Sequence, residues 1–251
     1  MDRDMDGKVV LVTGGGRGIG RATALSFAAR GANVVVGYFR NRDAAEETCS
    51  AIEDHGVKAL AVKAHVGDES QLGSLFDQVE EVFGCLDVFV SNAATGVIKP
   101  VTELDARSWD WTMDSNARAL LLGARRAAKL MPQGGSIIAV SSLGATRVLP
   151  NYAVVGASKA AIEALVRYLA VELAPMIRVN AVSPGVVDTD ALKHFPMREE
   201  MLQHAQASTP AGRLVTPEDV AGVVGFLTSP QSRMVSGQTI VIDGGASLLA
   251  V

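Results

Sequence analysis

The chain has 251 residues, 48% of them apolar, and carries a formal net charge of −4 at pH 7. This length fits one large domain or two small ones, and the apolar fraction is enough for a sizeable core. Because acidic and basic residues nearly balance, neither nucleic acid nor an anionic membrane surface is expected as a partner.

The two cysteines, Cys49 and Cys85, have no spacing typical of a metal site. So few cysteines do not suggest a disulfide framework, which favours a reducing compartment. The first eight residues, MDRDMDGK, are charged and lack the apolar stretch of a signal peptide. No apolar run approaches the ~20 residues that span a bilayer. We therefore expect a soluble, cytoplasmic protein without a bound metal.

Short β-branched runs alternate with longer helical patterns in the first part of the chain. In chain order we expect a strand at 8–13, a helix at 20–31, a strand at 33–38, a helix at 43–56, a strand at 57–66, a helix at 69–84, and a strand with its following loop at 86–94. Gly31 and Gly56 stand where helices of this kind end.

The alternation continues to the end of the chain. We expect a helix at about 105–131, a strand at 135–142, a helix at 152–174, a strand at 177–185, a helix at 216–229 and a strand at 237–245. The last helix has the clearest start, because Thr216 is a good cap and Pro217 takes the first helical position. Residues 188–213 have the weakest pattern and follow a strand end, where such folds build ligand sites. We expect a substrate lid there.

Strands that alternate with helices predict a Rossmann-like, doubly wound sheet of seven parallel strands with helices on both faces. The sequence has no internal repeat, low-complexity tract or linker. We therefore expect one domain that covers residues 1–251.

A glycine-rich turn, TGGGRGIG (residues 13–20), lies between the first strand and the first helix. Its spacing, Gly14-x3-Gly18-x-Gly20, differs from G-x-G-x-x-G. Glycines there allow a tight turn and let backbone N–H groups approach a pyrophosphate at the helix N-terminus. A plain tight turn is the alternative, but the flanking strand and helix favour dinucleotide binding by this turn, including Arg17 and Ile19.

The end of the second strand indicates which dinucleotide is bound. An NAD enzyme usually has an acid there to bind the ribose 2′-hydroxyl, whereas this strand is followed by Arg40 and Arg42. Guanidinium groups bind phosphate oxygens well, and Arg17 lies in the glycine turn. The sequence therefore predicts NADP (NADPH). The alternative that these arginines are solvated surface charges stays open, most of all for Arg42.

Over essentially its full length the chain resembles the short-chain dehydrogenase/reductase family. TGGGRGIG matches the cofactor turn T-G-x3-G-x-G of that family. SNAA (residues 91–94) stands where the family usually has N-N-A-G, so Asn92 and Ala93 keep their places and Ser91 and Ala94 are departures. The resemblance implies that Asn92 and Ala93 bind the cofactor.

Two further segments match cofactor-binding parts of the family. AHVGD (residues 64–68) stands where A-D-V-x-D is usual, so His65 replaces an adenine-contacting aspartate beside Val66. This departure puts the details of the adenine pocket in doubt. NAVSPGVVDT (residues 180–189) matches the segment that holds the nicotinamide. The resemblance implies that this segment contacts the cofactor through Pro184, Gly185, Val187 and Thr189.

The usual catalytic pair of the family is Y-x3-K. With Lys159 as the lysine, that tyrosine would stand at position 155, which is Val155. The tyrosine is instead Tyr152, in YAVVGASK, and Y-x6-K is the spacing of the family's enoyl-thioester reductases. SS (residues 141–142) ends the fifth strand, where the catalytic serine is expected; Ser142 is the candidate, and for Ser141 a structural role at the strand end is favoured. Asn116 matches a helix asparagine that holds a water near the lysine.

Four other stretches resemble the group of NADPH-dependent bacterial enoyl-[acyl-carrier-protein] reductase III enzymes. They are LDVFVSNAATGV (86–97), WDWTMDSNARALLL (109–122), DTDALKHFPMRE (188–199) and TPAGRLV (209–215). Some of them lie in the expected lid, which normally varies with substrate. The resemblance therefore reaches beyond the fold.

Helix geometry allows a pair seven residues apart to face one cleft. Seven residues turn a helix by ~700° and four by ~400°, so both spacings return close to the starting direction, but seven moves the tyrosine ~4.5 Å along the axis. In enoyl-thioester reduction, charge appears on the thioester oxygen, remote from the carbon that receives the hydride. The resemblance then implies that Tyr152 stabilises this oxygen, with Ser142 as a second donor and Lys159 on the nicotinamide ribose. This argument takes the helix as regular back to Tyr152.

These observations predict an NADPH-dependent reductase of the trans-2 double bond of enoyl thioesters, on acyl carrier protein or coenzyme A, in fatty-acid or related acyl-chain biosynthesis. Two alternatives stay open. One is a short-chain oxidoreductase acting on a carbonyl or alcohol, such as a 3-oxoacyl thioester, and the other is a cofactor-sensing regulator. The family resemblance also implies a homotetramer.

Overall fold

The computed structural model of the protein describes residues 3–189 and 198–249. Its strands form one parallel sheet in the order β3-β2-β1-β4-β5-β6-β7. They are β1 (Val9–Thr13), β2 (Asn33–Tyr38), β3 (Ala59–Lys63), β4 (Val88–Ser91), β5 (Gly135–Val140), β6 (Ile177–Pro184) and β7 (Thr239–Ile242). The predicted seven-stranded, doubly wound fold is confirmed. The strand order reverses between β1 and β4, which is where such sheets bind ligands.

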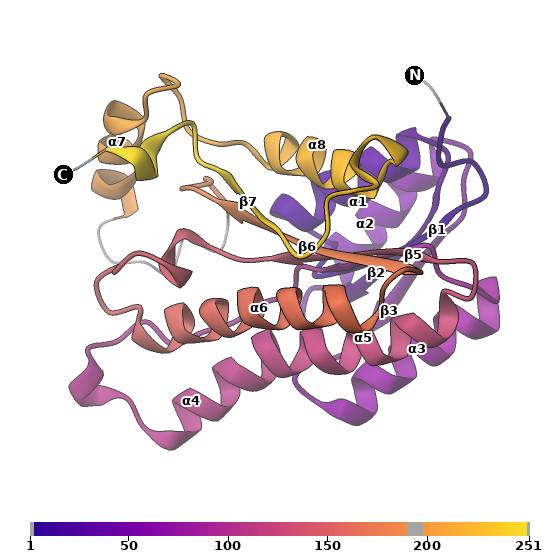
Figure 1. Cartoon of the computed structure of the whole chain (residues 1–251), viewed down its shortest axis with the longest axis horizontal. Helices are drawn as coiled ribbons and strands as arrows, with labels where there is room; N and C mark the ends of the chain where they lie inside the picture. Colours follow the sequence, from indigo (N-terminus) through magenta and orange to yellow (C-terminus); the bar gives the residue numbers. More distant parts are fainter. Residues whose placement is uncertain (1–2, 190–197, 250–251) are drawn as a thin grey trace.

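Helices cover both faces of the sheet (Figure 1). They are α1 (Gly18–Ala29), α2 (Arg42–Glu53), α3 (Glu69–Phe83), α4 (Ala106–Met113), α5 (Ala119–Leu130), α6 (Ala153–Glu172), α7 (Arg198–Ser208) and α8 (Pro217–Thr228). One face carries α1, α2 and α8, and the other carries α3, α5 and α6. Among the helices that the structure describes, none is both long and apolar enough to cross a membrane.

The sheet separates two hydrophobic clusters. Along β1, Val10 and Val12 pack into the cluster beneath α1 and α8, whereas Leu11 packs into the cluster beneath α3 and α5. All five residues of β1 are buried. A parallel strand covered on both faces is expected to be apolar throughout, which explains why VVLVT does not alternate.

The predicted helix at 105–131 contains a wider turn. α4 and α5 are joined through residues Asp114–Arg118, which form a π-helical turn. Such turns are rare and frequently mark functional sites, and this one contains Asn116. Side-chain periodicity does not reveal a single π turn, so the sequence predicts one continuous helix.

The helix predicted at 152–174 begins one residue later, so the regular helix back to Tyr152 on which the spacing argument depends is not present. α6 begins at Ala153, and Tyr152 is its N-cap with φ −107° and ψ 11°. The preceding Asn151 has φ +60°, a left-handed conformation that turns the chain into the helix. Pro150 precedes it and restricts the chain further. Tyr152 still connects to the first turn, because its carbonyl accepts a hydrogen bond of 2.7 Å from the Gly156 N–H.

The expected lid at 188–213 is described only in part. Its C-terminal portion contains α7, and residues 190–197 lie outside the described residues. After α7, the Ala211 N–H donates to the Gly244 carbonyl at 3.1 Å, which ties this segment to the chain end beyond β7. Figure 1 shows α7 beside the C-terminal turn.

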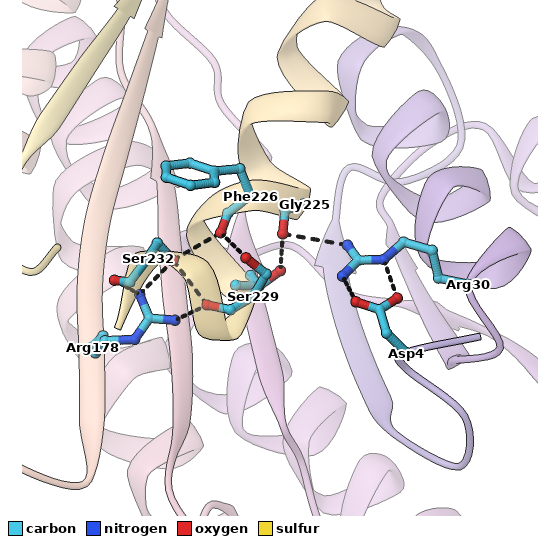
Figure 2. A network of polar contacts seen from close by, with 8 residues as sticks. Asp4, Arg30, Arg178, Gly225, Phe226, Ser229 and Ser232 are labelled. Atoms are coloured by element: carbon cyan, nitrogen blue, oxygen red, sulfur yellow. Dashed lines mark hydrogen bonds and ion pairs between the residues drawn. The ribbon is translucent and has the colours of Figure 1, made fainter. Parts of the chain in front are cut away.

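A partly buried arginine holds the end of the sheet opposite the carboxyl ends of the strands (Figure 2). Arg178, near the start of β6, donates to the Leu227 carbonyl at 2.7 Å and to the Ser232 carbonyl at 3.1 Å. Its other terminal nitrogen donates to Ser136 Oγ on β5 at 3.1 Å. Nearby, Arg30 joins Asp4 to the Gly225 carbonyl of α8. These contacts fix α8 against the sheet.

Candidate functional site

A cavity of about 750 Å³ opens at the carboxyl ends of the strands. Its wall contains twelve of the predicted cofactor-binding residues: Gly14, Arg17, Gly18, Ile19, Gly20, Arg40, His65, Val66, Asn92, Ala93, Lys159 and Thr189. They come from segments spread over the chain, and the parallel sheet brings them together because its strands all end at one edge. The cavity is large enough for a dinucleotide-sized ligand.

The glycine turn forms one wall of the cavity. Gly14 has φ +67°, and a methyl group on it would lie 2.9 Å from Asn92 Nδ2. A methyl group on Gly20 would collide with the Gly14 carbonyl oxygen. The turn therefore requires glycine at both positions. It leads directly into the N-terminus of α1, whose N–H groups favour an anion.

Hydrogen bonds connect the glycine turn to the loop after β4. Asn92 Nδ2 donates to the carbonyl of Thr13 at 2.9 Å and to that of Gly14 at 3.1 Å. Thr13 Oγ1 accepts from the backbone N–H groups of Asn92 and Ala93, both at 3.1 Å. Asn92 and Ala93 thus fix the floor of the cavity despite the departures from the family pattern at Ser91 and Ala94.

Two of the three arginines considered for a phosphate face the cavity. Arg17 is the N-cap residue of α1, and Arg40 follows the end of β2, where its guanidinium lies 5.4 Å from the centre of the Phe39 ring. Arg42 is different, because it pairs with Glu46 one helical turn later at 2.6 Å and does not line the cavity. Arg17 and Arg40 therefore line the space that a ligand would occupy, whereas Arg42 does not.

Three aromatic rings in the cavity wall contact one another, and the sequence analysis does not predict this arrangement. The His65 ring stacks on Trp111 with ring centres 4.7 Å apart and contacts Phe39 with ring centres 4.6 Å apart. The Trp111 indole N–H donates to Thr95 Oγ1 at 3.1 Å. Ser115, one turn after Trp111, is buried in the wall, and its Oγ has no hydrogen-bond partner among the described residues. The i, i+4 spacing of Trp111 and Ser115 is a signal that could have indicated this shared face.

The segment after β6 contributes less directly. Pro184, Gly185 and Val187 do not line the cavity, whereas Thr189 does. The Gly185 N–H donates to the Ile242 carbonyl of β7 at 2.8 Å, and Val187 forms an isolated parallel bridge with Val215. These contacts hold the backbone that carries Thr189 next to Gly18, where a methyl group on Gly18 would lie 3.2 Å from Thr189 Cγ2.

Lys159 is buried at the inner end of the cavity. Its Nζ donates to the Val140 carbonyl at the end of β5, at 2.7 Å. Burial lowers the pKa of the Lys159 ammonium to about 8, because water no longer solvates the charge. The hydrogen bond to the strand carbonyl holds the ammonium in a fixed position.

Tyr152 packs against the 3₁₀ turn Leu143–Ala145 that follows β5. Its half-buried phenol forms a hydrogen bond with the hydroxyl of Ser142. Burial raises the pKa of the phenol, and the hydrogen bond with Ser142 offsets part of this rise. Ser142 Oγ also accepts from the Gly144 N–H at 3.1 Å. Ser141 points elsewhere, since its hydroxyl donates to Glu163 at 2.7 Å.

Val155 occupies the position where the usual tyrosine of the family would stand. It is buried, and a methyl group on Gly96 would collide with Val155 Cγ2, so the loop after β4 lies directly on this side chain. The Lys99 N–H, three residues beyond Gly96, donates to the Asn151 carbonyl at 3.1 Å. The loop thus covers position 155 and reaches the residue before Tyr152.

Asn116 stabilises the same loop from the π turn. Its Oδ1 accepts from the Thr95 N–H at 2.9 Å, and its Nδ2 donates to the Thr95 carbonyl at 2.9 Å and to Ser158 Oγ at 2.8 Å. Within the described part of the chain, the Asn116 side chain bonds to Thr95 and to Ser158, the residue before Lys159, rather than to Lys159 itself. Asn116 therefore links the loop to α6.

Comparison with protein-family models identifies the family of this chain. A family model described as "Enoyl-(Acyl carrier protein) reductase" matches residues 14–247. The chain is a short-chain dehydrogenase/reductase of this family. The match includes the glycine turn, the loop after β4 and the Tyr152–Lys159 pair, and it confirms the resemblance seen in the sequence.

Individual short-chain dehydrogenases/reductases similar to this chain act on different groups. The 1-cyclohexenylcarbonyl-CoA reductase of Streptomyces collinus is 44% identical over 246 residues, which are 97% of this chain and 88% of that protein. The hydroxynaphthalene reductase-like protein Arp2 of Metarhizium robertsii is 39% identical over 97% of this chain and 96% of its own.

A solved structure agrees with the fold. The 7α-hydroxysteroid dehydrogenase complexed with NADH and 7-oxo glycochenodeoxycholic acid has a TM-score of 0.92 and 34% identity, and the match covers 97% of this chain and 96% of that one. Short-chain dehydrogenases/reductases bind nicotinamide cofactors, so this chain is an oxidoreductase of that type. Among the described residues, no three His, Cys, Asp or Glu side chains come together as metal ligands.

Proposed function

We propose that this protein uses NADPH to reduce the trans-2 double bond of an enoyl thioester. One observation carries the proposal: the phenol that is hydrogen-bonded to Ser142 comes from Tyr152, while the usual tyrosine position holds Val155, buried under the Gly96 loop. The 44% identity with a 1-cyclohexenylcarbonyl-CoA reductase supports it, since that name denotes reduction of an unsaturated acyl thioester.

The cavity suits a nicotinamide dinucleotide. The glycine turn leaves no room for side chains where a pyrophosphate would approach, and α1 directs its N-terminus there. The buried Oγ of Ser115 needs a partner that a ligand can supply. We assign the 2′-phosphate to Arg40 and Arg17, because β2 ends without an acid and both guanidinium groups line the cavity.

In this reaction each residue of the site has a separate role. Lys159 binds the nicotinamide ribose hydroxyls, and its positive charge favours negative charge nearby. NADPH, when bound, supplies the hydride that the reaction adds to Cβ of the substrate. The Tyr152 hydroxyl donates a hydrogen bond to the thioester oxygen, where the enolate charge develops. The Ser142 hydroxyl donates to the phenol oxygen, which orients the phenol and lets its O–H donate to the thioester oxygen. A proton taken up from solvent adds to Cα of the enolate and completes the saturated acyl thioester.

The second candidate function is that of a short-chain oxidoreductase acting on a carbonyl or alcohol. It is favoured by relatives such as the Arp2 reductase-like protein and by the solved hydroxysteroid dehydrogenase. A serine-bonded phenol near a buried lysine also fits proton donation to a reduced ketone. The two functions differ in which atom receives hydride, so they can be separated by substrate.

The test is an absorbance assay of NADPH oxidation with two substrates. The purified protein is mixed with NADPH and crotonyl-CoA, and separately with acetoacetyl-CoA. We expect turnover with the enoyl thioester and at least about 10-fold less with the ketone. NADPH oxidation with acetoacetyl-CoA alone would refute the proposal in favour of the second candidate. Crotonyl carried on acyl carrier protein, run in parallel, shows which carrier is preferred.

The remaining parts of the proposal concern the setting of the enzyme. We propose an acyl thioester on coenzyme A or acyl carrier protein as the partner, a cytoplasmic location and a homotetramer. Exposed apolar side chains on α5 and α6, namely Leu121, Tyr168 and Val171, support a self-association surface.

A further inference from the structure

The Tyr152 ring lies directly against a glycine. Gly144 is in a short 3₁₀ turn, Leu143–Ala145, and a methyl group placed on it would lie 2.5 Å from Tyr152 Cε1 and 2.7 Å from Cδ1. Gly144 does not have a positive φ, so alanine can adopt the same backbone conformation. What Gly144 provides is therefore space for the ring.

A second glycine brings the same two segments together. A methyl group on Gly156, in the first turn of α6, would lie 2.8 Å from the Gly144 carbonyl oxygen and 3.8 Å from Tyr152 Cδ1. The 3₁₀ turn and the start of α6 thus meet at two residues without side chains, and the tyrosine ring lies at the junction. No space remains in which the ring could keep its position if Gly144 carried a methyl group.

Gly144 also acts on the group that the phenol contacts. Its N–H donates to Ser142 Oγ at 3.1 Å, and Ser142 forms the hydrogen bond with the Tyr152 hydroxyl. Gly144 therefore contacts both partners of that hydrogen bond. Its Cα packs against the Tyr152 ring, and its N–H donates to Ser142.

We infer that Gly144 is a positioning residue that sets the direction of the Tyr152 phenol. Because α6 begins only at Ala153, helix geometry does not fix Tyr152, and the contact with Gly144 supplies the missing constraint. The choice of enoyl thioester as the test substrate rests on the proposed function, but the contact between the two residues does not. If acetoacetyl-CoA proves to be the substrate, the same measurements are made with it.

The first test is Gly144→Ala. We expect kcat to fall by about 10- to 100-fold, since a displacement of about 1 Å at a reacting group has effects of this size. The Kd for NADPH, measured by fluorescence titration, should stay within about 2-fold, because Gly144 does not line the cofactor cavity. Gly222→Ala on α8 is the control, as a methyl group there meets nothing within 4 Å. An unchanged kcat in Gly144→Ala would overturn the inference.

A double-mutant comparison separates positioning from general damage. In a Tyr152→Phe background, the hydroxyl that Gly144 is inferred to direct is already gone. Gly144→Ala should then lower kcat by less than about 3-fold further. A loss as large as in the wild-type background would show that Gly144 acts independently of the phenol and would contradict the inference.

A spectroscopic test requires no substrate. The sequence has three tyrosines, so 3-fluorotyrosine labelling gives three ¹⁹F resonances, and Tyr152→Phe identifies the one from position 152. Gly144→Ala should shift that resonance and leave those of Tyr38 and Tyr168 in place. No shift at Tyr152 would refute the inference. If Gly144→Ala does not fold, Gly156→Ala takes its place, with the same direction of change and a smaller shift expected.

Discussion

At the scale of single residues, Tyr152 bears most of the proposed chemistry. Tyr152→Phe keeps the ring against Gly144 and removes only the hydroxyl, so we expect kcat with crotonyl-CoA to fall by about 100- to 1,000-fold, as for the loss of one oxyanion donor. The Kd for NADPH should hardly change, because Tyr152 does not line the cofactor cavity. Steady-state kinetics and a binding titration measure both. Wild-type turnover in the variant would remove Tyr152 from the site.

The lowered pKa of Lys159 predicts how the free energy of unfolding depends on pH. Its pKa is about 8 in the folded protein, below its usual 10.5, so between these values the unfolded chain binds more protons. The free energy of unfolding should therefore gain up to about 1.4 kcal/mol per pH unit from this residue as pH rises from 8 to 10. Urea unfolding of wild type and Lys159→Met at several pH values isolates this slope. The same slope in both proteins would contradict it, and Lys129→Met, an exposed lysine of α5, is the control.

The two arginines after β2, Arg40 and Arg42, provide a variant and its matched control for testing which cofactor is bound. Arg40 lines the cavity, whereas Arg42 pairs with Glu46 on the outside of α2. Arg40→Ala should weaken NADPH binding by about 10-fold and leave NADH binding nearly unchanged, since only NADPH carries the 2′-phosphate. Arg42→Ala should leave both unchanged. Equal losses of NADPH and NADH in Arg40→Ala, measured by fluorescence titration, would disprove the assignment.

At the scale of elements, Arg178 fixes α8 without touching the site. Its guanidinium donates to several carbonyls at and after the helix end, so Arg178→Met would remove the donor from the partly buried carbonyls of Leu227 and Ser232. We expect a loss of about 2 to 4 kcal/mol in the free energy of unfolding and an unchanged Kd for NADPH. Arg167→Met, which removes an exposed arginine of α6, should cost less than about 0.5 kcal/mol. Equal unfolding midpoints for the two variants in urea would contradict this role.

Sequence reasoning worked best where periodicity and capping determine the structure. The order and type of the strands followed from their β-branched runs, and α8 begins at the predicted Thr216 cap, with a complete capping box. The irregular backbone at Asn151 and Tyr152 was not predicted, because a left-handed Asn151 leaves little sequence signal. The place of Trp111 was missed for another reason: it depends on a contact with His65, which lies far away in the chain. The contact of Gly144 with Tyr152 lies in an irregular turn, which side-chain periodicity does not predict.

At the scale of the whole molecule, the helices on one face present apolar side chains to solvent. Tyr168 and Val171 on α6 are 69% and 77% exposed. If the exposed patch at Tyr168 and Val171 joins subunits, Val171→Glu should lower the mass measured by light scattering during gel filtration, because it would bury a charge at the interface. Val82→Glu, on the exposed side of α3, should leave the mass unchanged. A wild-type protein that already runs as a monomer would refute the homotetramer.

The fold as a whole brings the cofactor cavity, Lys159 and Tyr152 to one edge of the sheet, and the central claim concerns where the phenol meets the substrate. The most direct measurement is a crystal structure of the ternary complex with NADP and a non-reactive enoyl-thioester analogue. We predict that the Tyr152 hydroxyl lies within hydrogen-bond distance of the thioester oxygen and still contacts Ser142. A phenol turned away from that oxygen, with another side chain bonded to it, would contradict the account.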